Sequence, residues 1–184
     1  MNKKKDLIRK RFFLKRKKNY FEIKESFFAP LIDLIKKSKI IKKKHISLYY
    51  PNLFETNVLK ILDLEFFKKF IFFLPVIEKK NSMSFYKWRK GDILFINKYG
   101  IPEPLKTKKI DPTIILVPLL AYDKNKNRLG YGKGFYDNYL NKLFNKRKKI
   151  LSIGIAFSFQ KYHKLPTNCK DFKLNYIITE KGIF

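Results

Sequence analysis

Apolar residues gather in short runs that are separated by polar segments. The clearest run covers residues 114–118, where Ile, Ile, Leu and Val follow one another without alternation. A continuous apolar run of this length is typical of a strand buried on both faces of a parallel sheet. Two shorter runs, at residues 84–86 and 93–96, predict a small antiparallel excursion. Further strands are predicted at residues 45–50, 70–74, 152–156 and 176–178.

Helical patterns lie between these runs. Residues 3–37 are basic and place apolar residues at a period of roughly 3.6. We predict a break near Asn19, and Pro30 is expected to start or kink a second helix. Residues 57–67 and 136–144 are also predicted to be helical. Strands that alternate with helices indicate an α/β domain with a mainly parallel sheet, and 184 residues fit one domain better than two.

The formal net charge of +28 has two competing explanations. One is nucleic-acid binding, because Lys and Arg release counterions from phosphates. The other is codon bias, since Lys, Asn, Ile, Phe and Tyr have codons rich in A and T. Only six of the 43 Lys and Arg residues are arginines, whereas the planar fork of Arg suits phosphates and base edges. We favour codon bias and expect no specific nucleic-acid partner, although the positive field should attract anionic substrates.

Cysteine usage and the N-terminus bear on localisation. The one cysteine, Cys169, excludes an internal disulfide and a multi-cysteine zinc site, and suits a reducing compartment. The basic start lacks the apolar run of about 7–15 residues that a signal peptide needs. The longest apolar stretch, residues 70–76, is too short to span a bilayer and contains Pro75. We expect a cytoplasmic protein without a membrane partner, and take a monomer as the working expectation.

Residues 128–137 form the most distinctive segment, Arg-Leu-Gly-Tyr-Gly-Lys-Gly-Phe-Tyr-Asp. Three of the seven glycines alternate here. Alternate glycines let backbone N–H groups face one way and approach an anion closely. The N-terminus of the helix that follows also favours phosphate. Arg128 and Lys133 add positive charge, and Asp137 stands where a carboxylate can hold Mg²⁺ bound to phosphates.

This segment has alternative interpretations. Its spacing is not that of a Walker A loop. A glycine-rich turn is often only a tight connection, and Asp137 at a helix start can be an ordinary cap. On the residues alone, phosphate binding and a purely structural role are equally supported.

The same string resembles the ATP and folate loop of 5-formyltetrahydrofolate cyclo-ligases, also called methenyltetrahydrofolate synthetases. Other matches to that family follow in order along the chain: Glu103, Pro104, Asp111, residues 114–117, Pro118, Asp123, Gly154, Ala156, Phe157, Gln160, Pro166, Asp171, Ile178, Thr179 and Glu180. The similarity is dense over residues 111–180 and thinner before them. It implies one three-layer α/β/α domain over residues 1–184, similar to the ribose-isomerase and CoA-transferase-like fold.

The resemblance also implies which residues bind. Lys5 and Arg9, one helical turn apart, match an opening basic pair of the family, so the basic segment of residues 1–37 is expected to contribute to the ATP site. The loop positions implied for ATP are Arg128, Leu129, Gly130, Tyr131, Gly132, Lys133, Gly134, Phe135 and Tyr136. The positions implied for the folate are Leu48, Leu53, Tyr99, Tyr131, Gly132, Lys133, Gly134 and Phe135. Those implied for Mg²⁺ are Asp137 and Asp171.

The reaction implied by the resemblance is the ATP-dependent cyclisation of 5-formyltetrahydrofolate to 5,10-methenyltetrahydrofolate, with release of ADP and phosphate. The formyl oxygen attacks the γ-phosphate, nitrogen 10 captures the iminium phosphate, and phosphate leaves. Protein groups then act by positioning and charge neutralisation, with Lys133 and Arg128 as the catalytic cations, helped by Arg9 and Mg²⁺. His45 and His163 are expected to be surface or packing residues.

Two positions depart from the family's pattern. The expected folate-binding glutamate falls on Leu53, and Glu55 lies two residues later. A lost carboxylate would weaken recognition of the ring donors of the pterin. Asn138 stands where many relatives carry Arg. Two alternatives therefore stay open: a divergent relative that keeps ATP and has lost folate, and a basic nucleic-acid-binding module.

Overall fold

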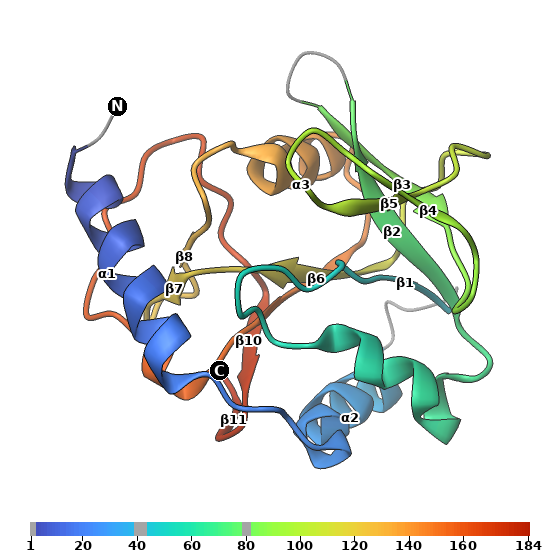
Figure 1. Cartoon of the computed structure of the whole chain (residues 1–184), viewed down its shortest axis with the longest axis horizontal. Helices are drawn as coiled ribbons and strands as arrows, with labels where there is room; N and C mark the ends of the chain where they lie inside the picture. Colours follow the sequence, from blue (N-terminus) through green and yellow to red (C-terminus); the bar gives the residue numbers. More distant parts are fainter. Residues whose placement is uncertain (1–2, 39–43, 79–81) are drawn as a thin grey trace.

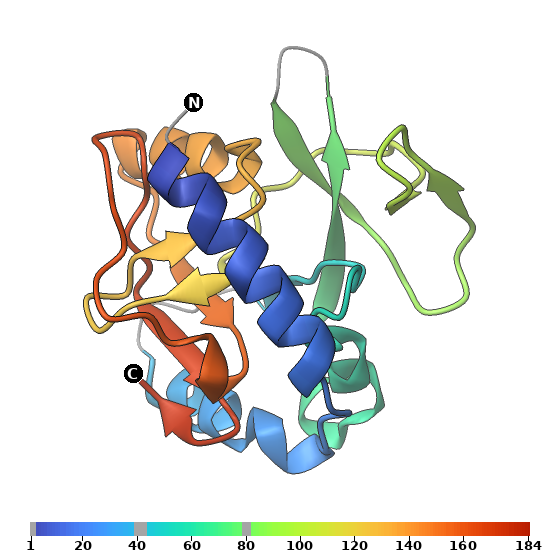
Figure 2. The ribbon, with the colours of Figure 1, turned by 60° about the vertical axis from the view of Figure 1, so that its left-hand side comes forward.

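A seven-stranded sheet forms the centre of the molecule (Figures 1 and 2), in a computed structural model that describes residues 3–38, 44–78 and 82–184. Within these residues the strand order is β11-β10-β9-β6-β1-β2-β3. The five inner strands pair in parallel, and β3 and β11 pair antiparallel at the two edges. The bounds are β1 (His45–Ser47), β2 (Ile71–Ile77), β3 (Met83–Lys87), β6 (Ile114–Pro118), β9 (Leu151–Ile155), β10 (Tyr176–Thr179) and β11 (Gly182–Ile183).

Strand β6 shows how both faces of the sheet are buried. Ile114 and Leu116 pack into one core cluster, whereas Ile115 and Val117 pack into the other. Figure 1 shows the helices that cover these clusters, with α2 on one side of the sheet and α3 on the other. The helices of the first cluster are η1 (Glu25–Phe28), α2 (Ala29–Lys37), η2 (Val58–Asp63) and η3 (Glu65–Phe67), and that of the second is α3 (Phe135–Asn145). The predicted α/β fold with a mainly parallel sheet is confirmed.

Residues 57–67 form two short 3₁₀ helices, η2 and η3, and the prediction of one continuous helix is wrong in type. Leu64 between them is extended, with φ −82° and ψ 128°. This kink lets Val58, Ile61 and Phe67 all turn into the core. Burial of apolar side chains therefore decides the local geometry here, and each piece is short, as 3₁₀ helices usually are.

The predicted pairing of residues 84–86 with 93–96 is also wrong. Strand β3, which contains the first run, pairs antiparallel with β2 and extends the main sheet. The second run lies in β4 (Leu94–Ile96), which pairs with β5 (Pro102–Pro104) in a separate two-stranded sheet. Met83 and Phe85 of β3 join the core cluster beneath α3, so pairing with β2 buries apolar area that a free hairpin would leave in water.

Helix α1 (Lys3–Asn19) ends at the predicted break and packs over a hairpin instead of a sheet face. The hairpin is formed by β7 (Ala121–Tyr122) and β8 (Arg128–Leu129). Ile8 and Phe12 of α1 share a small core cluster with it. Figures 1 and 2 show α1 along one side of the molecule, over this hairpin. The helix therefore lies beside the glycine-rich loop that follows β8.

Gly154 on β9 gives a first prediction, because no space is left for a side chain there. A Cβ would lie 2.6 Å from Ile177 Cδ1, 2.7 Å from Leu119 Cδ2 and 2.9 Å from Leu174 Cδ1. Gly154→Ala should lower the free energy of unfolding by about 1–3 kcal/mol, since overpacking forces core side chains off their rotamers. Chemical denaturation measures the change. An unaltered denaturation midpoint would show that these side chains yield freely.

Candidate active site

The order of the strands places the candidate site beyond the carboxyl ends of β1 and β6. These strands are parallel neighbours, but the chain runs outward from β1 to β2 and in the opposite direction from β6 to β9 and β10. Open α/β sheets bind ligands at such a reversal. Residues 48–56 follow β1, and residues 119–134 lead from β6 into α3. Two segments that sequence analysis singled out therefore meet at one edge of the sheet.

The glycine-rich loop has a backbone that other groups can approach closely. Gly132 and Gly134 have φ of 94° and 72°, in the left-handed region that favours glycine. Gly134 is the N-cap of α3, so the loop leads into a helix N-terminus, where an anion is stabilised. A Cβ at position 132 would lie 3.0 Å from Arg9 Cζ. Glycine at this position thus lets a cation of α1 rest against the loop.

Helix α1 delivers the two predicted N-terminal cations to this region. Arg9 Nε donates to Gly130 O at 2.9 Å, and Arg9 Nη1 lies 2.5 Å from Asp6 Oδ1. Lys5 is buried, and its Nζ lies 2.5 Å from Asp171 Oδ2. Arg9 therefore contacts the glycine-rich loop directly, and Lys5 contacts Asp171, one of the two predicted metal ligands.

The two predicted metal ligands are both partners of cations. Arg128 Nη2 lies 2.7 Å from Asp137 Oδ1, with the Arg128 side chain 4% exposed. The same Asp137 oxygen accepts from Phe172 N at 3.1 Å. Asp171, the neighbour of Phe172, is bound by Lys5. These contacts tie α1, the loop and residues 168–172 together, and among the described residues no group of three His, Cys, Asp or Glu side chains forms a metal cage.

The turn after β1 holds a buried carboxyl that sequence analysis did not place in the site. Leu53 and Phe54 have φ of 50° and 64°, which non-glycine residues rarely adopt. This double reversal leaves both side chains exposed and turns Glu55 inward, to 8% exposure. Glu55 Oε2 accepts from Asn52 N at 3.1 Å. A carboxyl is therefore present near the position where the family's glutamate seemed lost.

Burial raises the pKa of Glu55 to about 7, although the Arg16 charge and the Asn52 N–H act in the opposite direction. The Glu55 charge in turn reaches three phenols: Tyr49, Tyr131 and Tyr136. Burial is the main reason that the pKa of each phenol is raised, to about 12 for Tyr131. All three hydroxyls therefore stay protonated at neutral pH, beside a carboxyl that titrates there.

The remaining predicted residues lie at varied depths. The rings of Tyr99 and Phe135 meet edge to face with centroids 6.1 Å apart, and Lys133 Nζ lies 5.8 Å from the Tyr99 centroid. Leu48 and Leu129 are buried, so their side chains belong to the core beneath the site. Of the two histidines, His45 packs against Phe73 and His163 is exposed, as expected.

Two motif residues, Asp123 and Gln160, support the site from within the core and are almost fully buried. The buried Asp123 accepts from the backbone N–H groups of Asn125, Asn127 and Leu165. Gln160 Nε2 donates to the carbonyls of Leu119 and Leu120, each at 2.9 Å. Both side chains hold the segment after β6 in place. A structural role in the fold therefore explains why Asp123 and Gln160 match the family's pattern.

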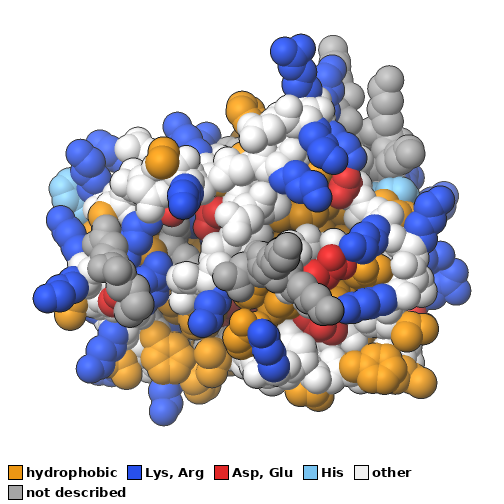
Figure 3. Space-filling model, turned by 90° about the horizontal axis from the view of Figure 1, so that it is seen from above, with side chains coloured by type: hydrophobic (Ala, Val, Ile, Leu, Met, Phe, Trp, Pro, Cys, Tyr) orange, Lys and Arg blue, Asp and Glu red, His pale blue; other side chains and the backbone are white. Residues whose placement is uncertain are grey.

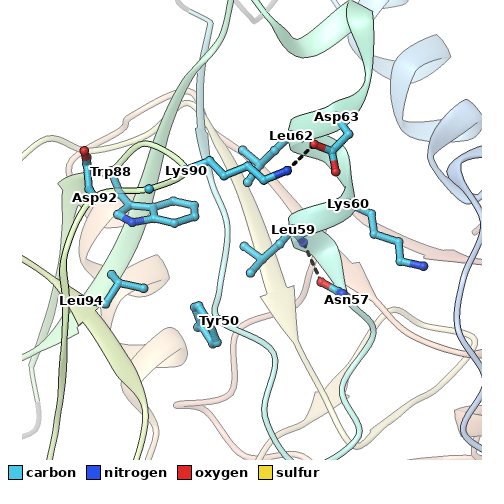
Figure 4. Close-up of a pocket in the computed structure, with 11 residues that line it drawn as sticks. Tyr50, Asn57, Leu59, Lys60, Leu62, Asp63, Trp88, Lys90, Asp92 and Leu94 are labelled. Atoms are coloured by element: carbon cyan, nitrogen blue, oxygen red, sulfur yellow. Dashed lines mark hydrogen bonds and ion pairs between the residues drawn. The ribbon is translucent and has the colours of Figure 1, made fainter.

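A separate cleft of about 380 Å³ lies between η2 and the β3–β4 connection (Figure 4). Tyr50, Trp88 and Leu94 face its interior. At its rim Lys90 is paired with Asp63 at 2.5 Å. No residue of the glycine-rich loop lines this cleft, so it is separate from the candidate site.

Basic side chains are found over much of one face of the molecule (Figure 3). On the face in Figure 3, Lys and Arg side chains alternate with hydrophobic patches and with Asp and Glu. Among the helices of the described residues, none is long and apolar enough to cross a membrane.

Comparisons with known proteins agree with the resemblance. The family model for the 5-formyltetrahydrofolate cyclo-ligase family matches residues 1–180. A probable 5-formyltetrahydrofolate cyclo-ligase of Schizosaccharomyces pombe is 31% identical over 138 residues, 67% of this chain and 68% of that protein. The 5,10-methenyltetrahydrofolate synthetase of Aquifex aeolicus superposes with a TM-score of 0.73 at 29% identity, covering 97% of this chain and 91% of that one. The synthetase of Mycoplasma pneumoniae gives 0.70 at 26% identity, covering 97% and 98%.

The buried Glu55 predicts a specific dependence of stability on pH. A pKa raised from 4.5 to about 7 means that folding favours the protonated form. The contribution of the protonated Glu55 carboxyl to the free energy of unfolding is therefore complete below about pH 4.5. This contribution is lost as the pH rises through about 7. Glu55→Gln removes this loss, so its unfolding free energy at pH 8 should exceed that of the unchanged protein by about 1–3 kcal/mol.

Denaturation at several pH values measures this difference, which should be near zero at about pH 4.5 and grow as the pH rises. The exposed Glu65 supplies the matched control, because Glu65→Gln should give a difference that stays small at every pH. A Glu55→Gln difference that does not change with pH would show that the carboxyl is solvated.

Proposed function

The chain belongs to the 5-formyltetrahydrofolate cyclo-ligase family, and from this premise we propose that it cyclises 5-formyltetrahydrofolate to 5,10-methenyltetrahydrofolate with ATP. The observation that carries the proposal is the glycine-rich loop at the strand reversal, with Arg9 laid against it. The formyl oxygen takes the γ-phosphoryl group, and ADP leaves. Nitrogen 10 then attacks the formyl carbon and releases its proton, and phosphate leaves as the ring closes.

On the nucleotide side, Lys5, Arg9 and Lys133 are proposed to hold the phosphate chain. Arg9 and the loop are already in contact, and Lys133 is exposed at the tip of the loop. Backbone N–H groups between the glycines and the N-terminus of α3 add donors. Arg128, fixed by Asp137, supplies a steady charge behind the loop. Fixed charges that await the transferring phosphoryl group lower its barrier without reorganisation.

On the folate side, Glu55 is proposed to take the part that was expected at Leu53. Its carboxyl is buried, and its charge acts on the phenols of Tyr49, Tyr131 and Tyr136. A buried carboxylate regains stabilisation when ring N–H groups donate to it, which favours a pterin over molecules without such donors. This carboxyl supports retention of folate binding. The edge-to-face pair of Tyr99 and Phe135 offers an apolar surface for the ring.

Mg²⁺ is proposed to bind together with ATP. Asp137 and Asp171 fit by their chemistry, because Mg²⁺ bound to phosphates usually takes one or two carboxylates and keeps several waters. The two residues also belong to one network, since Asp137 accepts from the backbone N–H of Phe172. When bound, the ion neutralises charge on the phosphate chain. Arg128 and Lys5, which now contact these carboxylates, would share them with the ion.

A monomer in the cytoplasm is proposed as the working form. Cys169 is free and exposed, which suits a reducing compartment. Light scattering coupled to size-exclusion chromatography tests the monomer, and a dimer mass would overturn it.

The activity is tested directly with Mg-ATP and 5-formyltetrahydrofolate. We expect the near-ultraviolet absorbance of the methenyl product to appear, with one ADP formed per product molecule. A chelator added to a parallel reaction should abolish turnover if Mg²⁺ is required. Absence of the product together with absence of formyl-folate-dependent ADP would refute the proposed function.

Lys133 provides a test of the loop assignment. Lys133→Ala should raise the KM for ATP by about 10- to 100-fold, because it removes a charge-assisted hydrogen bond to phosphate. Steady-state kinetics at saturating folate measure this change. Lys124→Ala is the matched control, an exposed lysine in the turn between β7 and β8. Equal KM values for the two variants would remove Lys133 from the ATP site.

A further inference from the structure

Arg16, in the last turn of α1, is the most deeply buried cation among the described residues, at 1% exposure. Its guanidinium contacts three segments that lie far apart in the sequence. Nη2 donates to Leu53 O at 2.7 Å, in the turn after β1. Nη1 donates to Leu119 O at 3.1 Å, in the segment after β6. Nη2 also donates to the Tyr131 hydroxyl, in the glycine-rich loop.

Burying an Arg in this way is costly unless its donors are satisfied. The two terminal guanidinium nitrogens of Arg16 donate to two carbonyls and a phenol, whereas Nε has no hydrogen-bond partner within the described residues. The guanidinium carbon also lies 5.6 Å from the centroid of the Tyr131 ring. A lysine has one nitrogen and no fork, so it cannot bridge the same three acceptors. The geometry at this position therefore requires Arg.

The turn held by Arg16 is strained. Leu53 and Phe54 both occupy the left-handed region without being glycine, which costs on the order of 1–3 kcal/mol per residue. Such strain persists only where surrounding contacts over-determine the backbone. The hydrogen bond from Arg16 to Leu53 O is one such contact. The same reversal turns Glu55 inward, so Arg16 and the position of the Glu55 carboxyl are linked.

We propose that Arg16 is a positioning residue that ties the glycine-rich loop to the turn carrying Glu55, so that the nucleotide side and the folate side of the site are held as one unit. The inference rests on the proposed function for its catalytic meaning. The tie itself is a property of the folded chain. Holding both reactants in register matters because small misplacements of reacting groups cost large factors in rate.

Two substitutions break the tie from opposite ends. Arg16→Lys keeps the positive charge and loses the fork. Tyr131→Phe keeps the ring and loses only the hydroxyl that Arg16 contacts, so it remains informative even if the Arg16 variant folds poorly. Arg11→Lys is the matched control, an exposed arginine on the same helix. Circular dichroism and thermal melting establish that each variant is folded under the assay conditions.

Hydrogen–deuterium exchange of the ligand-free protein decides the structural claim. Tyr131→Phe should speed exchange about threefold or more in peptides that cover residues 130–134, because the loop loses its contact with Arg16. Arg16→Lys should speed exchange in these peptides and also in those that cover residues 53–56, because it removes the hydrogen bond to Leu53 O as well. Peptides from β6 and β9 should not change, which distinguishes a local release from general loss of stability. Arg11→Lys should leave all four regions unchanged. Unchanged exchange at residues 130–134 in Tyr131→Phe, or at residues 53–56 in folded Arg16→Lys, would overturn the proposal.

Kinetics decide the catalytic claim. Arg16→Lys and Tyr131→Phe should each raise the KM for 5-formyltetrahydrofolate about tenfold. A mere loss of folded protein lowers kcat and leaves KM alone. The double variant should be no worse than Arg16→Lys, since the change at Arg16 already removes the contact that Tyr131→Phe removes. The catalytic claim would be overturned by additive effects of the two substitutions on KM, or by a KM that neither substitution changes. Inactivity of the unchanged protein would refute the proposed function, while the exchange experiment would still decide the tie.

Discussion

The docking of a basic helix through its own buried cations is the interaction on which the rest of the site depends. The buried residues of α1 are Lys5, Ile8, Phe12 and Arg16, so its inward stripe begins and ends with a charge. Desolvating such cations costs several kcal/mol each unless they are paired and hydrogen-bonded. Lys5 meets Asp171, and Arg16 meets two carbonyls and a phenol. The polar contacts therefore fix where the helix lies, and the two apolar residues between them add the area that keeps it there.

This docking gives short, glycine-rich and strained segments a definite position. The loop around Gly132 would have many conformations by itself, but Arg9 rests against it and Arg16 holds Tyr131. The turn at Leu53 is unfavourable by itself and is fastened by the same helix. Helix α1 packs against the β7–β8 hairpin and not against a face of the central sheet, and it thus organises both halves of the candidate site.

The sequence predicted what depends on local pattern and missed what depends on tertiary contact. The run at 114–118 identified a strand buried on both faces, and the glycine spacing identified the loop. The inward turn of Glu55 had no local signal, because Leu53 and Phe54 adopt positive φ without glycine. Arg16 was one basic residue in a helix full of them, and only the assembled fold shows its burial. The pairing of β3 with β2 was missed for the same reason, since it depends on burial of Met83 and Phe85 against α3.

The extreme charge and the scarcity of arginine acquire a structural meaning at the site. Three of the six arginines, Arg11, Arg89 and Arg147, are exposed. The other three, Arg9, Arg16 and Arg128, lie at the candidate site, and each donates hydrogen bonds through its guanidinium group. Lysine satisfies a position that needs only positive charge, whereas a fork that bridges several acceptors cannot be replaced by it. In a chain this rich in lysine, an arginine at an internal position therefore indicates a cation that must donate hydrogen bonds in a fixed geometry as well as supply positive charge.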